Sequence, residues 1–425
     1  MSERLMLRCD PSELETCCQK LIGALQQGAW VQLQAAAVEQ PLIPEALLPE
    51  GPGVVIASGG TSGGRKHCLQ PSRHLDQSAE ATAEWLLRQG LSPTQSLVLN
   101  PLPLHHVSGL MPWWRSRCWG AEHVFLTSHL MRDPEALALW FQSCPGLGDR
   151  PVLLSLVPTQ LKRLLDQPQG VYCLQRCAVI WIGGSPLSEP MAERARRAGL
   201  RLAPCYGSSE TAAMVTALPP EQFLAGVTGS GSPLSDVQLR LGEAGAIQVK
   251  TPRLALGCWT DQCSEALVDL QDPHGWWESG DLGELMPAES PAGLGLRVLG
   301  RRDGAIHCGG ETVFPEQLEL RLLDQASGAH LALAAVLFLA VEDEEWGQRL
   351  VALVRPRCGE DEAGLLKGLK QCCAEWIAAE RPAQWIVCPD LLATDSGKWE
   401  RHYWRDWLIN RQHDCQHSLG GKAGI

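Results

Sequence analysis

The feature that most constrains the fold is an alternation of short apolar runs with amphipathic stretches between Val54 and Cys205. Short apolar runs predict buried strands, and apolar residues that recur with a helical period predict helices. Strands that alternate with helices form a mostly parallel sheet with helices on its faces. The predicted strands are 54–57, 96–99, 152–157 and 178–182, and the predicted helices are 72–88, 134–141 and 188–198, the last with Ser188 and Gly199 as its caps.

The pattern changes twice in the rest of the chain. From 226 to 300, glycines and short alternating runs predict an antiparallel β subdomain with strands near 237–241 and 247–249. After Arg301, helices at 315–323 and 362–379 mix with strands at 333–341 and 350–354. We therefore expect an α/β protein in which residues 1–300 form a large N-terminal domain of parallel α/β sheets plus the β subdomain. Residues 301–425 form a small α+β C-terminal domain.

Composition excludes several classes of protein. The chain has 425 residues and a net charge of −12, and no run of basic residues is longer than two, so we expect no nucleic-acid partner. The longest apolar run, 331–341, is too short to cross a bilayer. The 17 cysteines include no C-x-x-C pair, and the N-terminus has no apolar signal segment. We expect a cytoplasmic protein with reduced thiols and no membrane association.

A glycine-rich loop, Ser58-Gly59-Gly60-Thr61-Ser62-Gly63-Gly64-Arg65-Lys66, follows the first of these predicted strands. Its four glycines, three hydroxyl residues and terminal lysine suit a loop whose backbone N–H groups bind a polyphosphate. A Walker A loop is excluded, because Arg65 and Lys66 stand where that motif has lysine and a hydroxyl residue. A nucleophile elbow at Ser62 matches G-x-S-x-G, but Pro71 prevents the helix that should follow directly. A glycine loop without a function is the third interpretation.

Five motifs in order carry a resemblance to a known family. The loop resembles T-S-G-T-T-G-x-P-K, the phosphate loop of the adenylate-forming superfamily of acyl-CoA synthetases, luciferases and peptide-synthetase adenylation domains. The other four resemble Y-G-x-T-E, T-G-D, G-R-x-D with its following turn, and G-K-x-x-R; they occupy 206–210, 278–281, 300–303 with 309–313, and 396–401. The resemblance covers 58 to 401 and implies a mobile C-terminal domain that rotates between two reaction steps.

The resemblance also implies which residues bind ATP and Mg²⁺. Lys66 neutralises the leaving phosphates, and Glu210 is the Mg²⁺ ligand, since a hard cation on phosphates takes one or two protein carboxylates. Asp281 accepts hydrogen bonds from the ribose hydroxyls. The other implied nucleotide-binding residues are Ser58, Thr61, Ser62, Gly63, Tyr206, Gly207, Ser209 and Arg301.

Two implied residues belong to the C-terminal domain. Asp303 is the hinge about which that domain turns, and Lys398 reaches the attacking carboxylate and the α-phosphate. Outside the motifs, each charged residue of this set has an alternative interpretation as an ordinary solvated charge.

The acyl pocket is read from residues 101–110, Pro-Leu-Pro-Leu-His-His-Val-Ser-Gly-Leu. This segment resembles L-P-L-F-H-V-S-G-L of o-succinylbenzoate–CoA ligases, the enzymes of menaquinone and phylloquinone biosynthesis. In those enzymes an arginine follows nine residues after the histidine, and Arg115 lies nine residues after His106. The resemblance implies that Arg115 binds a second substrate carboxylate and that His106, Gly183 and Ser208 line the acyl site. The alternatives are an exposed Arg115 and a core His106 with its hydrogen bonds satisfied.

The implied activity is that of an ATP-dependent acid–thiol ligase. It converts o-succinylbenzoate, ATP and CoA to o-succinylbenzoyl-CoA, AMP and pyrophosphate through an acyl-adenylate, with Lys398, Lys66 and His106 as catalytic residues. A ligase of the same superfamily with another acid is the nearest alternative. An adenylation domain that feeds a carrier protein, a non-catalytic nucleotide-binding protein and a serine hydrolase at Ser62 are the others.

Overall fold

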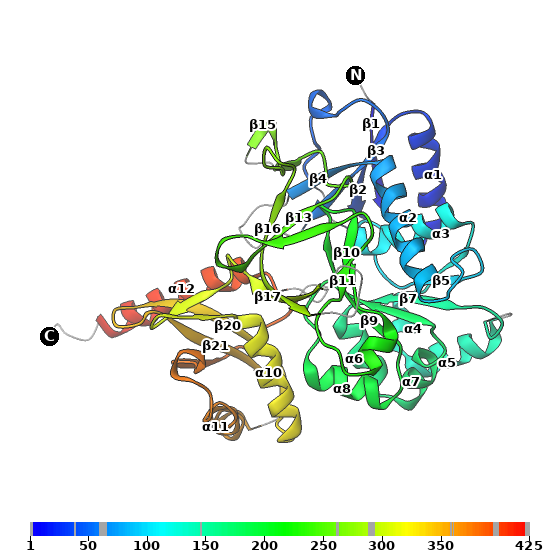
Figure 1. Ribbon diagram of the computed structural model, residues 1–425. Helices are drawn as coiled ribbons and strands as arrows, with labels where there is room; N and C mark the ends of the chain where they lie inside the picture. The colour runs from blue at the N-terminus through cyan, green and yellow to red at the C-terminus, as the bar shows by residue number, and fades with distance from the viewer. Residues whose placement is uncertain are drawn as a thin grey trace. The chain divides into compact units, whose positions relative to one another are not determined.

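The structure is a computed structural model that describes residues 3–37, 40–58, 66–144, 147–260, 263–287, 294–357, 359, 361–393 and 399–420 (Figure 1). The chain divides into two compact units. Unit 1 comprises Met1–Gly60 and Gly64–Leu299, and unit 2 comprises Thr61–Gly63 and Gly300–Ile425.

The first sheet of unit 1 has six strands in the order β1(Arg4–Cys9), β2(Trp30–Ala35), β3(Gly53–Ser58), β4(Lys66–Pro71), β14(Cys258–Thr260) and β15(Cys263–Val268). The first three strands are parallel, and the later pairs are antiparallel. One face packs on three helices, α1(Leu14–Gln26), α2(Ser72–Arg88) and α3(Val107–Trp119). The other face covers a smaller apolar cluster around Trp30 and Trp259.

The second sheet has seven strands in the order β11(Ser232–Pro233), β10(Ala213–Ala217), β9(Leu202–Ser208), β8(Val179–Ile182), β7(Val152–Leu156), β5(Leu97–Asn100) and β6(Glu122–Phe125). The strands from β9 to β6 are parallel. One face is covered by α5(Pro134–Ser143), α6(Pro158–Leu165), α7(Pro168–Leu174) and α8(Glu189–Arg197) (Figure 1). The short helices α4(Ser128–Arg132) and α9(Pro220–Leu224) complete this part of the unit.

Helix α2 packs into the cores of both sheets. Leu75 and Ala79 belong to the core under the first sheet, whereas Ala81, Trp85 and Leu86 belong to the core under the second. The helix has two buried faces because its apolar residues recur around more than half of its circumference. The same second core includes strands of a four-stranded sheet, β12(Gln238–Leu241), β13(Ala246–Lys250), β16(Trp277–Pro287) and β17(Leu294–Arg301).

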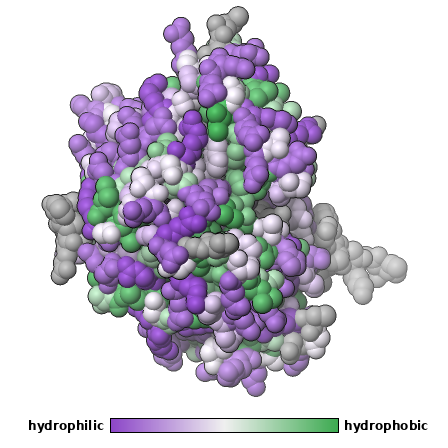
Figure 2. Space-filling view, turned by 90° about the vertical axis from the view of Figure 1, so that its right-hand side faces the viewer, coloured by the Kyte–Doolittle hydropathy of each residue, from purple (hydrophilic) through white to green (hydrophobic). Residues whose placement is uncertain are grey.

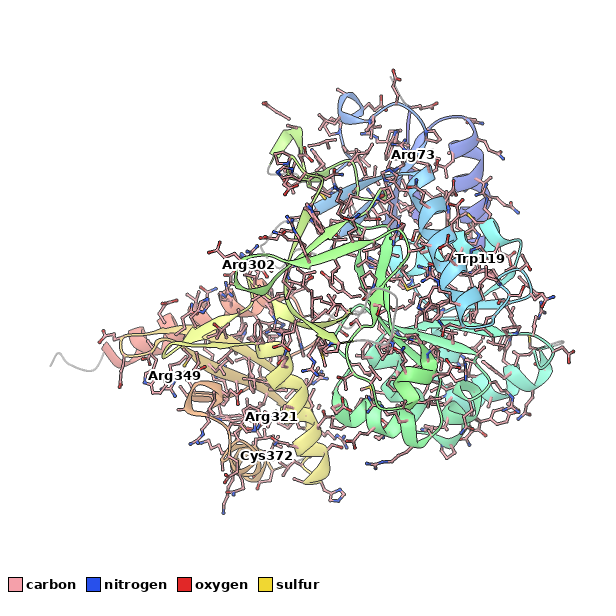
Figure 3. The ribbon with its side chains drawn as sticks, viewed as in Figure 1. Arg73, Trp119, Arg302, Arg321, Arg349 and Cys372 are labelled. Atoms are coloured by element: carbon pink, nitrogen blue, oxygen red, sulfur yellow. The ribbon has the colours of Figure 1, made fainter. Side chains whose placement is uncertain are left out.

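Unit 2 is a five-stranded sheet between helices. Its strands are β18(Ile306–Cys308), β19(Glu311–Val313), β20(Leu333–Asp343), β21(Gly347–Pro356) and β22(Gln384–Val387). One face packs on α10(Pro315–Gly328) and α11(Glu362–Cys372), and the other packs on α12(Arg401–Gly420). Figure 3 labels Arg321 on α10 and Cys372 at the end of α11.

The predicted α/β class is confirmed, with two corrections. The predicted strand at 54–57 lies in the first sheet, whereas those at 96–99, 152–157 and 178–182 lie in the second, so these strands form two sheets. The helix predicted to end at 379 ends at Cys372. The chain turns there because the buried Trp376 packs into the core and donates a hydrogen bond of 3.1 Å to Gln325.

Two findings concern the surface and the thiols. Within the described ranges, no helix has both the length and the apolar character needed to cross a bilayer. The face drawn in Figure 2 is mainly hydrophilic, with scattered hydrophobic residues among the polar ones. The cysteines whose side chains the structure describes are all free thiols, and most of them are buried.

Candidate functional site

The loops that follow three parallel strands of the second sheet carry predicted site residues. His106 follows β5, Gly183 follows β8, and Ser208 is the last residue of β9. Parallel strands end at the same edge of a sheet, and ligands of such sheets bind outside the carboxyl ends of the strands. The sheet therefore brings these three segments to one edge.

The phosphate loop is described only at its two ends. Ser58 ends β3 and Lys66 begins β4, and these residues are directly opposite each other in the antiparallel pair. Thr61, Ser62 and Gly63 lie outside the described residues. The Ser58 hydroxyl forms a hydrogen bond with the thiol of Cys68, on which the charge of Glu210 also acts. The first sheet thus brings Ser58 near the carboxylate of Glu210.

Glu210 lies in a tight turn between β9 and β10. Ala212 and Ala213 in this turn have φ values of 50° and 85°, a left-handed conformation that costs energy for residues other than glycine. At Gly207 a Cβ atom would meet the carbonyl oxygen of Ala213 at 2.1 Å, so the two strands can approach only because this residue has no side chain. The turn holds Glu210 in a strained, closely packed segment.

Hydrogen bonds from the first sheet hold the same turn. Gln70 on β4 donates to the carbonyl oxygens of Ser209 at 2.8 Å and Glu210 at 3.1 Å. The backbone N–H of Ala255 donates to the same Glu210 oxygen at 2.8 Å. His74 in turn lies 3.3 Å from Gln70 Oε1 through its Nδ1 atom. These bonds fix the backbone from which the Glu210 carboxylate extends.

Arg253 stabilises the turn from within the protein, a role that no sequence motif indicates. Its side chain is fully buried and donates to the carbonyl oxygens of Thr211 and of Met214, the latter at 2.9 Å. Asp236 accepts two further hydrogen bonds from it, at 2.7 and 3.3 Å. A lone arginine in a stretch of β character shows no spacing that predicts such a role. Gln70 was missed for the same reason.

Tyr206 and Asp281 come together from two different sheets. The Tyr206 hydroxyl on β9 donates a hydrogen bond of 2.6 Å to Asp281 Oδ2 on β16. Burial, and then the charge of Asp281, raise the pKa of Tyr206, and the charge of Glu210 acts in the same direction. The Asp281 backbone N–H donates to Ser279 Oγ at 3.2 Å. The phenol, the two carboxylates and the end of β9 therefore form one group.

Arg115 on α3 is a buried cation. Only 4% of its surface is exposed, so the alternative of an exposed arginine is wrong. Its Nε and one terminal nitrogen have no hydrogen-bond partner among the described residues, and the guanidinium lies 5.6 Å from the ring centre of Trp181 on β8. Burial lowers the pKa of Arg115 to about 10. Buried donors without acceptors are costly, and an anion can satisfy them.

Other predicted residues of the acyl site lie around these elements. Cys205 on β9 donates from its thiol to the carbonyl oxygen of Ile182, the residue before Gly183. His106 is the N-cap residue of α3, with its ring 4.3 Å from that of His105. The assignment of His106 to the acyl pocket stays a prediction.

Unit 2 contains the remaining predicted residues. Arg301 donates to both carboxylate oxygens of Asp303, at 3.0 and 3.1 Å. Arg401, the last residue of the G-K-x-x-R motif, is buried and donates to Glu319 at 2.7 Å and to the carbonyl oxygen of Phe338 at 2.9 Å. Lys398 lies outside the described residues.

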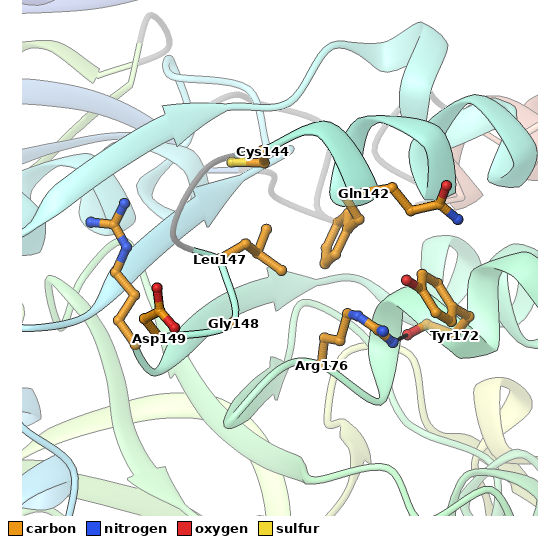
Figure 4. Close-up of a pocket in the computed structure, with 9 residues that line it drawn as sticks. Gln142, Cys144, Leu147, Gly148, Asp149, Tyr172 and Arg176 are labelled. Atoms are coloured by element: carbon orange, nitrogen blue, oxygen red, sulfur yellow. Dashed lines mark hydrogen bonds between the residues drawn. The ribbon is translucent and has the colours of Figure 1, made fainter.

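A recess of about 460 Å³ lies elsewhere in unit 1, at the ends of α5 and α7 (Figure 4). Its lining includes Gln142, Asp149 and Tyr172, and the guanidinium of Arg176 lies 3.5 Å from the Tyr172 ring centre. None of the predicted site residues lines this recess.

The charged side chains of Glu210, Lys66 and Asp281 suit a nucleotide and its cation. The Glu210 carboxylate supplies an oxygen ligand of the kind that Mg²⁺ takes together with phosphate oxygens. Lys66 supplies a compact positive charge, and the Asp281 carboxylate supplies an acceptor for hydroxyl groups.

Comparisons with known proteins agree with this chemistry. The chain is 29% identical over 348 residues to a 2-succinylbenzoate–CoA ligase of Listeria innocua, with 82% of this chain and 68% of the relative covered. It is 30% identical over 375 residues to that of Geobacillus kaustophilus, with 85% and 71% covered.

Solved structures share the fold. The o-succinylbenzoate CoA synthetase of Bacillus subtilis, in complex with its acyl-adenylate intermediate, superposes with a TM-score of 0.70 at 22% identity, covering 94% of this chain and 87% of that chain. An arginine-to-lysine variant of Escherichia coli MenE, with OSB-AMS bound, superposes with a TM-score of 0.68 at 23% identity, covering 96% of this chain and 88% of that chain. Residues 6–259 match the family described as AMP-binding enzyme, and the chain therefore belongs to that family.

Proposed function

We propose that the protein is an AMP-forming acid–thiol ligase that joins o-succinylbenzoate to CoA. The observation that carries the choice of acid is Arg115, a buried cation on α3 with two donor nitrogens that have no partner among the described residues. A substrate that keeps one carboxylate after the other is activated satisfies those donors, and a simple benzoate or fatty acid does not. The curated relatives named 2-succinylbenzoate–CoA ligase support the same choice.

In the first step, the substrate carboxylate attacks the α-phosphorus of ATP, and pyrophosphate leaves. Lys66 and the loop residues Ser58, Thr61, Ser62 and Gly63 neutralise and orient the leaving phosphates. Glu210 holds Mg²⁺, which supplies charge neutralisation on the phosphate oxygens when bound. Lys398 orients the attacking carboxylate and the α-phosphate. The chemistry is mainly positioning, which the hydrogen-bonded turn at Glu210 suits.

The nucleotide base and ribose are held by the group around the end of β9. Asp281 accepts from the ribose hydroxyls, and Tyr206, Gly207 and Ser209 line the base and phosphate side. Arg301 completes the nucleotide contacts. On the acyl side, Arg115 binds the second carboxylate, while His106, Gly183 and Ser208 line the pocket.

In the second step, the CoA thiol attacks the acyl carbonyl and AMP leaves with the bonding electrons. We assign ATP and acyl binding to residues 1–300 and the domain rotation between steps to residues 301–425, with Asp303 as the hinge. A cytoplasmic location, where ATP, CoA and Mg²⁺ are abundant, is part of the proposal. The product suits menaquinone or phylloquinone biosynthesis.

Pyrophosphate release tests the proposal. The protein is incubated with ATP, Mg²⁺ and o-succinylbenzoate, or with a panel of benzoates and fatty acids, with and without CoA. Release confined to o-succinylbenzoate, and a thioester that forms only with CoA, is the expected result. Release with another acid keeps the ligase chemistry and discards the substrate. No release with any acid favours a non-catalytic nucleotide-binding protein, and labelling of Ser62 by a fluorophosphonate favours the hydrolase.

A further inference from the structure

Two thiols and one carboxylate converge beside the proposed nucleotide site. Cys68 on β4 and Cys258 on β14 are directly opposite each other in an antiparallel pair, and their sulfur atoms are 3.3 Å apart. Both cysteines are buried. One ligand atom from each of Cys68, Cys258 and Glu210 lies within 4.8 Å of the other two.

The backbone holds all three residues in place. The strand pair fixes the two cysteines, and the hydrogen bonds from Gln70 and Ala255 fix the carbonyl of Glu210. Ala255 precedes Cys258 by three residues, so one segment carries a thiol and also anchors the carboxylate. Glu210 is only partly buried, whereas both cysteines are buried.

The chemistry of this group differs from that of an Mg²⁺ site. Thiolates select soft or borderline cations such as Zn²⁺, whereas Mg²⁺ takes oxygen ligands. With Zn–S bonds of about 2.3 Å and tetrahedral angles, two sulfur ligands lie about 3.8 Å apart, a small widening of the distance observed here. Two thiolates and a carboxylate also leave the fourth tetrahedral position open.

We propose that Cys68, Cys258 and Glu210 form a binding site for a thiophilic divalent cation of the Zn²⁺ class. The cation enters as two thiol protons leave to solvent, so the site gains no net charge. Bound there, it occupies the carboxylate that the proposed function assigns to Mg²⁺, and it thereby inhibits adenylation. Only this inhibitory consequence rests on the proposed function; the binding site itself does not.

Cobalt(II) is the direct probe, because thiolate ligands give its complexes a charge-transfer absorption. The full chain, reduced with a phosphine that does not bind the metal, is titrated with Co²⁺ as wild type, Cys68→Ser and Cys258→Ser. Cys118→Ser, which changes an exposed thiol, is the matched control. In the wild type and the control, we expect the charge-transfer absorption to saturate at one Co²⁺ per chain. We expect the absorption to be lost in both site variants. Added Zn²⁺ should displace Co²⁺ and so remove the absorption from the wild type.

Two results overturn the site. One is the absence of the absorption in reduced wild type with a native circular dichroism spectrum, which indicates an ordinary packed thiol pair. The other is its persistence in a folded Cys68→Ser/Cys258→Ser variant, which places the metal on other thiols. If one single variant fails to fold, the other variant and the wild-type spectrum still decide the matter.

Inhibition is measured separately, by pyrophosphate release with excess Mg²⁺ and increasing Zn²⁺. We expect half-inhibition of the wild type at a Zn²⁺ concentration at least about 10-fold lower than for the double variant, with equal activity in the absence of Zn²⁺. Equal sensitivity overturns the inhibitory role. If no acid supports pyrophosphate release, the proposed function fails, and the cobalt spectrum still tests the site.

Discussion

The hydroxyl of Tyr206 donates a hydrogen bond of 2.6 Å to the carboxylate of Asp281 and so joins strands β9 and β16 of two different sheets. The bond orients the Asp281 carboxylate, whose oxygens are acceptors of the kind that hydroxyl groups of a ligand need. Because the phenol is buried and lies next to a negative charge, its pKa is raised and it stays a donor at neutral pH. The pair is therefore set before a nucleotide arrives.

Asp281→Asn tests the ribose assignment. The amide cannot accept from both ribose hydroxyls and the phenol as a carboxylate does, so we expect KM for ATP to rise at least about 10-fold. Glu284→Gln, at an exposed position of the same strand, is the control. Initial rates of pyrophosphate release at varied ATP concentration give both values. An unchanged KM in Asp281→Asn contradicts the assignment.

Arg115→Leu tests the acid specificity. Loss of the buried guanidinium should raise KM for o-succinylbenzoate about 100-fold. It should leave the stability unchanged or increase it, since a buried cation is removed that has two donors without acceptors among the described residues. Arg117→Leu removes an exposed neighbour on the same helix and serves as control. Kinetics with the diacid are combined with thermal melting. A variant that uses the diacid as well as the wild type does would assign the guanidinium a purely structural role.

Arg253→Met tests the support of the Glu210 turn. The substitution removes the hydrogen bonds that Arg253 donates to the carbonyls of Thr211 and Met214, and it leaves Asp236 without its ion-pair partner. We expect a loss of about 3–5 kcal/mol in the free energy of unfolding. Arg240→Met, in an exposed ion pair, should cost less than about 1 kcal/mol. Urea denaturation measures both, and similar losses in the two variants would remove the special role of Arg253.

The folded protein should lose stability in mild acid through His74. Burial, followed by the charges of Arg73 (Figure 3) and Arg253, lowers the pKa of His74 to about 4. The unfolded chain binds this proton near pH 6.5 and the folded chain binds it only near 4, so stability is lost as the pH falls between these values. A shift from 6.5 to about 4 corresponds to a loss of about 3 kcal/mol in the free energy of unfolding.

Denaturation curves at several pH values test this. The stability of His74→Gln should depend less on pH in that window than that of the wild type. His129→Gln, at an exposed position, should keep the wild-type dependence. Parallel curves for all three proteins exclude the buried histidine as the cause.

Lys398→Ala separates the two proposed half-reactions. Adenylation should be abolished, whereas transfer from supplied acyl-AMP to CoA should remain largely intact, because the lysine acts on the attacking carboxylate and the α-phosphate only in the first step. Lys367→Ala, at an exposed position of α11, is the control. An equal fall in both half-reactions argues against alternation of the domain between steps.

Local pattern was enough to predict most elements, and it failed where long-range pairing decides. Apolar runs found β7 and β8, and caps found α8, with Ser188 accepting a hydrogen bond from the N–H of Met191. Strands β3 and β5 lie in different sheets because each pairs with different neighbouring strands. The apolar periodicity within a strand does not determine which strands pair with it. The N-terminal strands β1 and β2 were not predicted, because they lie before the first motif of the chain.

The residues of the candidate site also fall into a predictable set and an unpredictable set. Motif residues such as Tyr206, Glu210 and Asp281 could be found because phosphate and ribose chemistry requires particular side chains in a particular order. Arg253 and Gln70 could not, because each acts on backbone carbonyls far away in the chain, and any residue type can supply a carbonyl. The burial of Arg115 could not be predicted either, because the residue type alone does not show whether a guanidinium is exposed or buried.

Helix α2, whose two faces lie in two different cores, makes the sheets of unit 1 interdependent. Neither sheet can lose its packing without exposing part of this helix to water, so amide hydrogen exchange should find both sheets in one cooperative class. A chimaera that takes one sheet from a relative must also accommodate the opposite face of α2. Exchange of halves between relatives is therefore more disruptive at this helix than at the surface loops.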